Sequence, residues 1–370
     1  MLNNSSYNYT FPAIRGIQAG REYYVVMCPL KLIPKLFTFD GQEIPPSLRA
    51  QRILNKARIP EMAKYILKND EDYIFSSLTA SIDGAVKFSS LGKKDGDYKV
   101  GQLVVSIDSN FLINDGQHRV AAISEALKQQ PSIGSETISI VLFIDAGLKH
   151  AQQMFADLNK HAIRPTRSIG ILYDSRDEFS RFMLDLIEET PIFKNLVELE
   201  KTTISNRSPT MFTLSSLYQA NLALLGKSKK NYDLTVEEKN FAKAFWKEVT
   251  NYIPEWQQVI QRKINSAELR KDFVHSHGLA LHSLGIIGYS LKEKYTDNWK
   301  DVIKKIDGVD WARSNTNLWE GRAMIAGRIS KAQTNLRLTV NVLKKSIGLD
   351  LTEEEEKIEQ KFYAGHGGNY

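Results

Sequence analysis

Hydrophobic and polar positions divide the chain into two parts with different periodicities. In the first part, short apolar runs bounded by turn residues predict strands. Four of these runs are residues 24–30, 85–88, 102–107 and 138–144. The last run is almost continuously apolar, which predicts a strand buried on both faces. Beyond about residue 170 a helical period continues nearly to the end. We therefore expect an α+β domain of residues 1–170 followed by an all-helical domain of residues 171–370.

One junction in the first part combines a strand end, a glycine and a helix start. Apolar residues 111–113 lead into Asn114-Asp115-Gly116-Gln117-His118-Arg119, and apolar positions 120, 123 and 127 then follow a helical period over residues 117–129. The first turn of a helix has unpaired N–H groups, and a glycine lets another group approach the backbone closely. With His118 and Arg119 beside them, these groups suit an anion such as phosphate. The alternative is a capped helix start with surface charges; the density of polar residues favours the anion site.

A second polar cluster follows the apolar run at 138–144 and a helical segment at residues 150–158. It contains Asn159, Lys160, His161 and Arg164. A polar loop that follows a buried strand tends to face the neighbouring polar loop, so we expect this cluster to lie opposite the junction at residues 114–119.

The charge distribution favours polyanionic partners. The chain has 370 residues with 49 Lys and Arg against 43 Asp and Glu, which gives a net charge of +6. Cations concentrate on one face of residues 49–68, and no acid occurs between residues 321 and 349. The candidate DNA-contacting side chains are Arg49, Arg52, Lys56, Arg58, Arg167, Arg328, Lys331, Arg337, Lys344 and Lys345. A solvated surface without a partner explains these clusters about equally well.

A single cysteine, Cys28, excludes an internal disulfide and suits a reducing cytoplasm. The nearby Lys31 and Lys35 would favour a reactive or DNA-proximal thiol, whereas a lone strand cysteine is more often a small buried hydrophobe.

The sequence supports neither a metal site nor a membrane span. His275, His277 and His282 lack the i, i+4 spacing of a helical metal site, so no metal site is predicted. There is also no run of about 20 apolar residues, so we expect no membrane span.

Two stretches resemble a known family. Residues Ile113 to Arg119, together with Phe155 to Lys160 leading to Pro165, are similar to DGQHR-domain proteins, which are distant relatives of the ParB/sulfiredoxin fold. A closer resemblance covers nearly the whole chain. Phe11 to Arg21 and Asn55 to Glu61 are similar to the DndB family of bacterial DNA phosphorothioation gene clusters.

The resemblance implies a ParB/sulfiredoxin-like first domain and a DNA-binding repressor of the sulfur-modification operon. Its implied partners are promoter DNA and other sulfur-modification proteins. A homodimer is expected because palindromic operators pair with two-fold symmetric proteins. A scaffold that docks on other sulfuration proteins is a further possibility.

The broader fold family implies a different function, nucleotide binding. ParB-like relatives hold nucleotide phosphates at the motif that matches Asp115 to Arg119, and some hydrolyse the nucleotide. Here Gly116 would hold phosphate, Arg119 would neutralise charge, and Asp115 would orient water or Mg²⁺. In that case Asp115, His118 and Arg119 would be catalytic. Sulfiredoxins have a cysteine where this chain has Gln117, which argues against sulfiredoxin chemistry.

Overall fold

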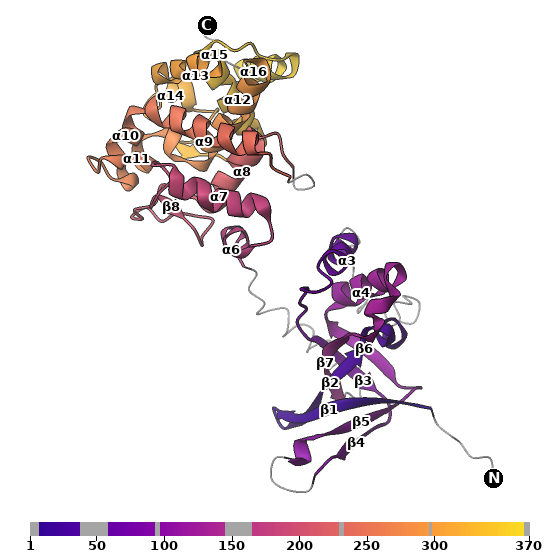
Figure 1. Cartoon of the computed structure of the whole chain (residues 1–370). Coiled ribbons are helices and arrows are strands. Elements are labelled where there is room, and N and C mark those ends of the chain that lie inside the picture. Colours follow the sequence, from indigo (N-terminus) through magenta and orange to yellow (C-terminus); the bar gives the residue numbers. More distant parts are fainter. Residues whose placement is uncertain are drawn as a thin grey trace, which may run out of the picture. The chain divides into compact units, whose positions relative to one another are not determined.

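The chain forms two compact units, Met1–Ile163 and Arg164–Tyr370 (Figure 1). The computed structural model describes residues 7–37, 58–92, 97–144, 165–228, 233–295 and 298–365. A seven-stranded mixed sheet and numerous helices make this an α+β protein, which confirms the predicted fold class.

The first unit is built on the seven-stranded sheet, whose strand order is β4-β5-β1-β2-β7-β3-β6. Its strands are β1 (Asn8–Gln18), β2 (Arg21–Pro29), β3 (Leu78–Asp83), β4 (Val86–Ser90), β5 (Val100–Ser106), β6 (Asn110–Asp115) and β7 (Thr137–Ile144). Neighbouring strands run antiparallel, except that β3 and β7 are parallel. Strand β6 lies at the edge of the sheet, next to β3. The junction at residues 114–119 follows β6 and therefore lies at this edge of the sheet.

Helices pack on one face of this sheet. They are α1 (Ile33–Leu36), α3 (Ile59–Lys68) and α4 (Gln117–Gln129), with short 3₁₀ turns η1 (Leu30–Leu32), η4 (Asp97–Lys99) and η5 (Pro131–Ser135). Val26 and Ile140 from the strands share a fully buried core with Ile66 and Ile123 from α3 and α4. Pro60 occupies the first turn of α3, as expected for a residue that lacks the N–H group.

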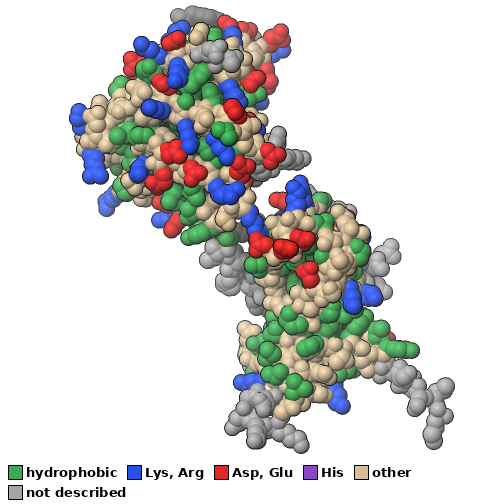
Figure 2. Space-filling view, in the orientation of Figure 1, with side chains coloured by type: hydrophobic (Ala, Val, Ile, Leu, Met, Phe, Trp, Pro, Cys, Tyr) green, Lys and Arg blue, Asp and Glu red, His purple; other side chains and the backbone are tan. Residues whose placement is uncertain are grey.

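The other face of the sheet is apolar and more exposed. Ile14 and Ile17 of β1 and Met27 of β2 are exposed. Figure 2 shows hydrophobic side chains gathered over the strands of this unit. In β7, deeply buried residues alternate with half-buried ones. The prediction that this strand is buried on both faces is therefore wrong, because within the described ranges of this unit the helices cover one face of the sheet.

The second unit is almost entirely helical. Its helices are α6 (Arg167–Tyr173), α7 (Glu178–Glu189), α8 (Leu214–Leu224), α9 (Val236–Asn251), α10 (Pro254–Ile260), α11 (Ser266–Asp272), α12 (Gly278–Lys294), α13 (Trp299–Ile303), α14 (Thr316–Trp319), α15 (Gln333–Ile347) and α16 (Glu353–Gly365). Two 3₁₀ turns, η6 (Val274–Ser276) and η7 (Lys304–Gly308), and two short strand pairs complete it. The strand pairs are β8 (Val197–Glu198) with β9 (Phe212–Thr213), and β10 (Met324–Ile325) with β11 (Arg328–Ile329).

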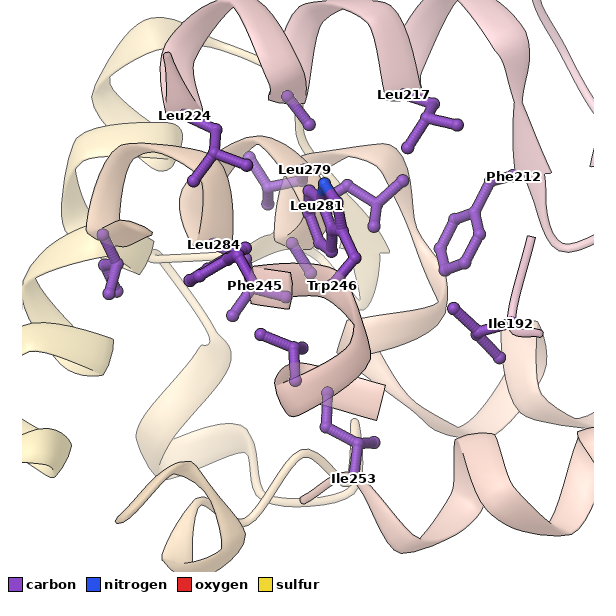
Figure 3. Close-up of a cluster of buried hydrophobic side chains, with 14 of the residues drawn as sticks. Ile192, Phe212, Leu217, Leu224, Phe245, Trp246, Ile253, Leu279, Leu281 and Leu284 are labelled. Carbon is purple, nitrogen blue, oxygen red and sulfur yellow. The ribbon is translucent and has the colours of Figure 1, made fainter. Parts of the chain in front are cut away.

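Helix α12 is the centre of this unit and packs against α8 and α15. Gly285 permits the closest approach, since a Cβ atom there would lie 2.1 Å from the Ala220 carbonyl oxygen of α8. Phe212, Trp246 and Leu281 are buried in the core between these helices (Figure 3). No helix in the described ranges is long and apolar enough to cross a membrane.

Candidate functional site

The junction between β6 and α4 has the geometry of an open helix start. Gly116 separates the strand from the helix with a φ of +107°, and no side chain caps the amino end of α4. A Cβ atom on Gly116 would lie 2.5 Å from Leu78 Cδ2. Both the positive φ and this contact require glycine. The N-cap glycine itself supplies no side-chain acceptor to the first turn of α4, and a helix start of this kind can meet an anion.

Arg119 connects this junction to the segment before β3. Its Nη2 donates to Asp115 Oδ2 at 2.5 Å, and its Nη1 donates to the carbonyl oxygens of Ser76 at 2.6 Å and Ser77 at 2.7 Å. The Arg119 side chain is 14% exposed and that of Asp115 is 44% exposed. Arg119 thus positions the junction, and Asp115 compensates its charge.

Two further polar residues of the motif also build the turn. Asn114 is fully buried and donates from Nδ2 to Ser81 Oγ at 2.7 Å. Gln117 donates from Nε2 to the Asn114 carbonyl oxygen at 3.4 Å. Much of the polarity that marks this motif in the sequence therefore serves local structure.

The structure brings Arg58 to the same place as His118. Burial lowers the pKa of His118, and the nearby positive charge of Arg58 lowers it further. Arg58 is exposed at the N-cap of α3, and no side chain caps this helix. Because α3 packs against α4, a cation from the first basic cluster lies near the open start of α4. We call Arg58, Gly116, Gln117 and His118 the anion corner.

Sequence reasoning assigned Arg58 and His118 to separate sites. The two residues are 60 positions apart, and the packing of α3 against α4 brings the charge of Arg58 near the His118 ring. The one shared signal is that each residue lies at the start of a predicted helix. Six other candidates, Arg49, Arg52, Lys56, Asn159, Lys160 and Arg164, lie outside the described residues, as does His161.

The cations of the acid-free segment in the second unit pair with acids on α16. Arg322 forms a buried bidentate pair with Glu359 at 2.6 and 2.8 Å. Arg337 pairs with Glu354 at 2.6 Å, Lys344 with Glu355 at 2.7 Å, and Lys345 with Glu359 at 3.2 Å. Among the acids at the start of α16, Glu354 is exposed, whereas Glu355 is half-buried against α15.

The remaining basic candidates in this unit differ in their contacts. Arg328 and Lys331 are exposed and form no ion pair among the described residues. The Arg167 guanidinium lies 5.7 Å from the centre of the Tyr218 ring. Figure 2 shows basic and acidic side chains interspersed over the visible face of this unit.

Cys28 is part of the core of the first unit. Its side chain is fully buried, and burial raises its pKa to about 12. The thiol therefore remains protonated near neutral pH. These are the properties of a small buried hydrophobe, and they do not favour a reactive thiol.

The histidines of the second unit serve internal contacts. His275 is fully buried, accepts a hydrogen bond from Trp256 Nε1 at 3.0 Å, and faces Glu255 at 3.3 Å. His277 donates from Nε2 to the Arg270 carbonyl oxygen at 2.8 Å. Within the described part of the chain, no three His, Cys, Asp or Glu residues gather as metal ligands.

Comparison with protein families identifies the class of protein. A family model described as "DNA-sulfur modification-associated" matches residues 11–350. The match covers nearly the whole chain, so the protein takes part in DNA sulfur modification. The family is DndB, and the chain belongs to it. Comparisons with curated proteins and with solved structures gave no match.

Proposed function

We propose that this chain is a cytoplasmic DNA-binding repressor of a gene cluster for DNA phosphorothioation. Membership in the DndB family and the net charge of +6 support this assignment. The observation that carries it is the packing of α3 against α4, which places the exposed Arg58 near enough to the start of α4 for its charge to act on His118. Cationic side chains and free helix N–H groups are the donors that proteins use to contact DNA phosphates.

The exposed face of α3 extends the anion corner. Lys64 and Lys68 are exposed on this helix and have no ion-pair partner among the described residues. The distance from Arg58 to Lys68 is about 15 Å at 1.5 Å per residue. A surface of that length can contact about three phosphates, so the logarithm of affinity should fall with a slope near −3 against the logarithm of salt concentration.

An electrophoretic shift assay tests the proposal. The full-length protein is titrated against the promoter of the gene cluster and against a shuffled duplex of equal length and composition. A repressor binds the promoter at least 1,000-fold more tightly than the shuffled duplex. Equal affinity for the two duplexes would contradict specific regulation, and absence of any shift at low salt would contradict DNA binding.

A second candidate function is nucleotide binding at the anion corner with Mg²⁺. The glycine N-cap with its positive φ and the uncapped start of α4 favour it, since such a start can hold a phosphate. The half-exposed carboxylate of Asp115 would orient water or Mg²⁺, while remaining paired with Arg119. Phosphate release with ATP or GTP that is lost in Asp115→Asn, with unchanged melting temperature, would support this function. Absence of turnover with all common nucleoside triphosphates would remove the hydrolytic version.

We also infer a homodimer in which the exposed apolar sheet face of the first unit contributes to the contact. Exposed Ile14 and Met27 support this inference, since large apolar patches mark interaction sites. Sedimentation equilibrium should give twice the chain mass for the wild type and a monomer for Ile14→Asp/Met27→Asp. A wild-type monomer at micromolar concentration would contradict it. Affinity purification from cells would show whether other sulfur-modification proteins bind as well.

A further inference from the structure

The second unit contains a cavity of about 810 Å³. This volume lies within the range of small-molecule binding sites. The loop after β8, the starts of α8 and α12, and helix α11 enclose the space, which we call the α11 cavity. It belongs to a different unit from the anion corner and shares no residue with it.

Four cations line the α11 cavity together with one carboxylate. The cations are Arg270 and Lys271 of α11, Arg313 and Lys331, and the carboxylate belongs to Glu268. Glu268 closes a capping box at the start of α11, where Asn265 Oδ1 accepts from its backbone N–H at 2.9 Å. The lining residues thus carry more positive than negative charge, because one carboxylate stands against four cations.

Arg270 keeps its charge although it is buried. Its guanidinium donates only to backbone carbonyl oxygens of the loop before α8, including those of Ser205 at 2.9 Å and Ser208 at 3.0 Å. These acceptors satisfy its hydrogen bonds but carry no formal charge. They also hold the loop in place, so that one wall of the cavity is preorganised.

Arg313 is bound in the same way. It donates to the carbonyl oxygens of Arg270 and Lys271, both at 3.0 Å, and to that of Gly327 at 2.6 Å. Lys271 and Lys331 are exposed and form no ion pair with any described carboxylate. The cations of this cavity therefore differ from those of α15, because the cations of α15 form ion pairs with carboxylates of α16.

The rest of the lining adds hydroxyl groups and apolar surface. Thr203 and Ser216 contribute hydroxyls, and the half-buried Ile204 contributes apolar surface. Helix α12 starts at the cavity without a side-chain cap. Burial lowers the pKa of His277 to about 4, so this residue is neutral at physiological pH. The lining therefore combines cationic, hydroxyl and apolar groups.

We propose that the α11 cavity binds a free nucleotide, with its phosphates on the cations and its base against Ile204. Cations and hydroxyls match phosphate oxygens, and the apolar surface matches a base rather than an inorganic ion. Duplex DNA is too wide to enter a space of this volume, so the occupant is a small molecule. The site stands independently of the proposed DNA contacts in the first unit.

Titration calorimetry on the full-length protein with ATP and ADP tests the proposal. The variant Lys271→Gln/Lys331→Gln removes two exposed cations that hold no structural contact with a described carboxylate. The matched control Lys247→Gln/Lys304→Gln removes two exposed lysines of the same unit that do not line the cavity. We expect the cavity variant to bind at least tenfold more weakly and the control to bind within twofold of the wild type.

A second control separates this cavity from the anion corner. In the background Arg58→Gln/His118→Asn, which changes two side chains of the anion corner and none of the cavity lining, nucleotide should still bind, and it should bind at least tenfold more weakly once Lys271→Gln/Lys331→Gln is added. Failure of ATP and ADP to bind at millimolar concentration would overturn the proposal. It would also be overturned if Lys271→Gln/Lys331→Gln bound with wild-type affinity, or if only the corner variant lost binding. Displacement of bound ATP by a short single-stranded oligonucleotide at equal affinity would assign the site to nucleic acid instead.

Discussion

The buried ion pair between α15 and α16 makes a sharp prediction about stability. Arg322 is 5% exposed and Glu359 is 4% exposed, and two hydrogen bonds of 2.6 and 2.8 Å join them. Lys345 and Asn341 also donate to the Glu359 carboxylate, both at 3.2 Å. Glu359→Gln keeps the side-chain shape but leaves the charge of Arg322 buried without its carboxylate.

The expected cost follows from this burial. Removing one partner of a buried ion pair costs about 3 to 5 kcal/mol, because the other charge stays buried and unpaired. We expect the lower value, about 3 kcal/mol, since the amide oxygen of Gln still accepts one hydrogen bond. In a unit of this size, that loss corresponds to a melting temperature about 6 to 12 °C lower.

Urea denaturation at pH 7, followed by tryptophan fluorescence, measures the change. The matched control is Glu354→Gln on the same helix, where the pair with Arg337 is also 2.6 Å long but the side chains are 53% and 74% exposed. That control should cost less than about 1 kcal/mol. Equal effects of the two substitutions would refute the reasoning, because burial would then make no difference.

Three further predictions concern single residues. Burial lowers the pKa of His277 to about 4 in the folded protein. As the pH falls from 6.5, this histidine is therefore protonated in the unfolded chain before it is protonated in the folded protein. The free energy of unfolding should then decrease between pH 6.5 and 4 by at most about 3 kcal/mol, and an unchanged pH slope in His277→Gln would contradict this. Gly116→Ala should destabilise the first unit by about 2 kcal/mol or more in urea denaturation, because of the positive φ and the contact with Leu78. Its control Gly308→Ala has open space around the new Cβ and should change little; equal effects would contradict the geometry. Cys28 should not react with a thiol reagent at pH 8 until the protein is unfolded, and immediate reaction of the native protein would contradict its burial.

Local chemistry in the sequence was enough to predict several elements. Helix α4 spans residues 117–129 as predicted, because the glycine before it and the apolar period within it are both local signals. The Thr-x-x-Glu pattern at Thr235 and at Thr352 is the sequence signature of a capping box, and reciprocal hydrogen bonds with Glu238 and Glu355 form it in both places. In each case, residues within one or two turns determine the structure.

Features that depend on distant pairing could not be predicted in this way. Residues 8–10 look like a loose polar segment, yet they form the start of β1 because β5 supplies hydrogen bonds from nearly 100 residues away. Four cations of the basic surface expected between residues 321 and 349 pair with acids of α16 for the same reason, whereas Arg328 and Lys331 form no ion pair with a described residue. A charge count along a sequence window does not include the carboxylates that a later helix brings to it.

The candidate site also combines features that depend on local sequence with features that depend on tertiary packing. The sequence motif located the anion corner, since Gly116 and the helix start are local features. The role of Arg119 in holding Ser76 and Ser77, and the approach of Arg58 to His118, depend on tertiary packing. The sequence therefore predicts the strand–glycine–helix junction but not the tertiary contacts around it, and anion binding at this junction stays a prediction.

The salt dependence of DNA affinity tests the central claim most directly. We predict that Arg58→Gln/Lys64→Gln makes the slope of log affinity against log salt less steep by about 2, because two phosphate contacts are lost. The variant Arg337→Gln/Lys345→Gln removes the same charge from side chains that pair with α16, and it should leave the slope unchanged. A wild-type slope in the first variant, or an equal reduction in both, would contradict a DNA-binding surface at the anion corner.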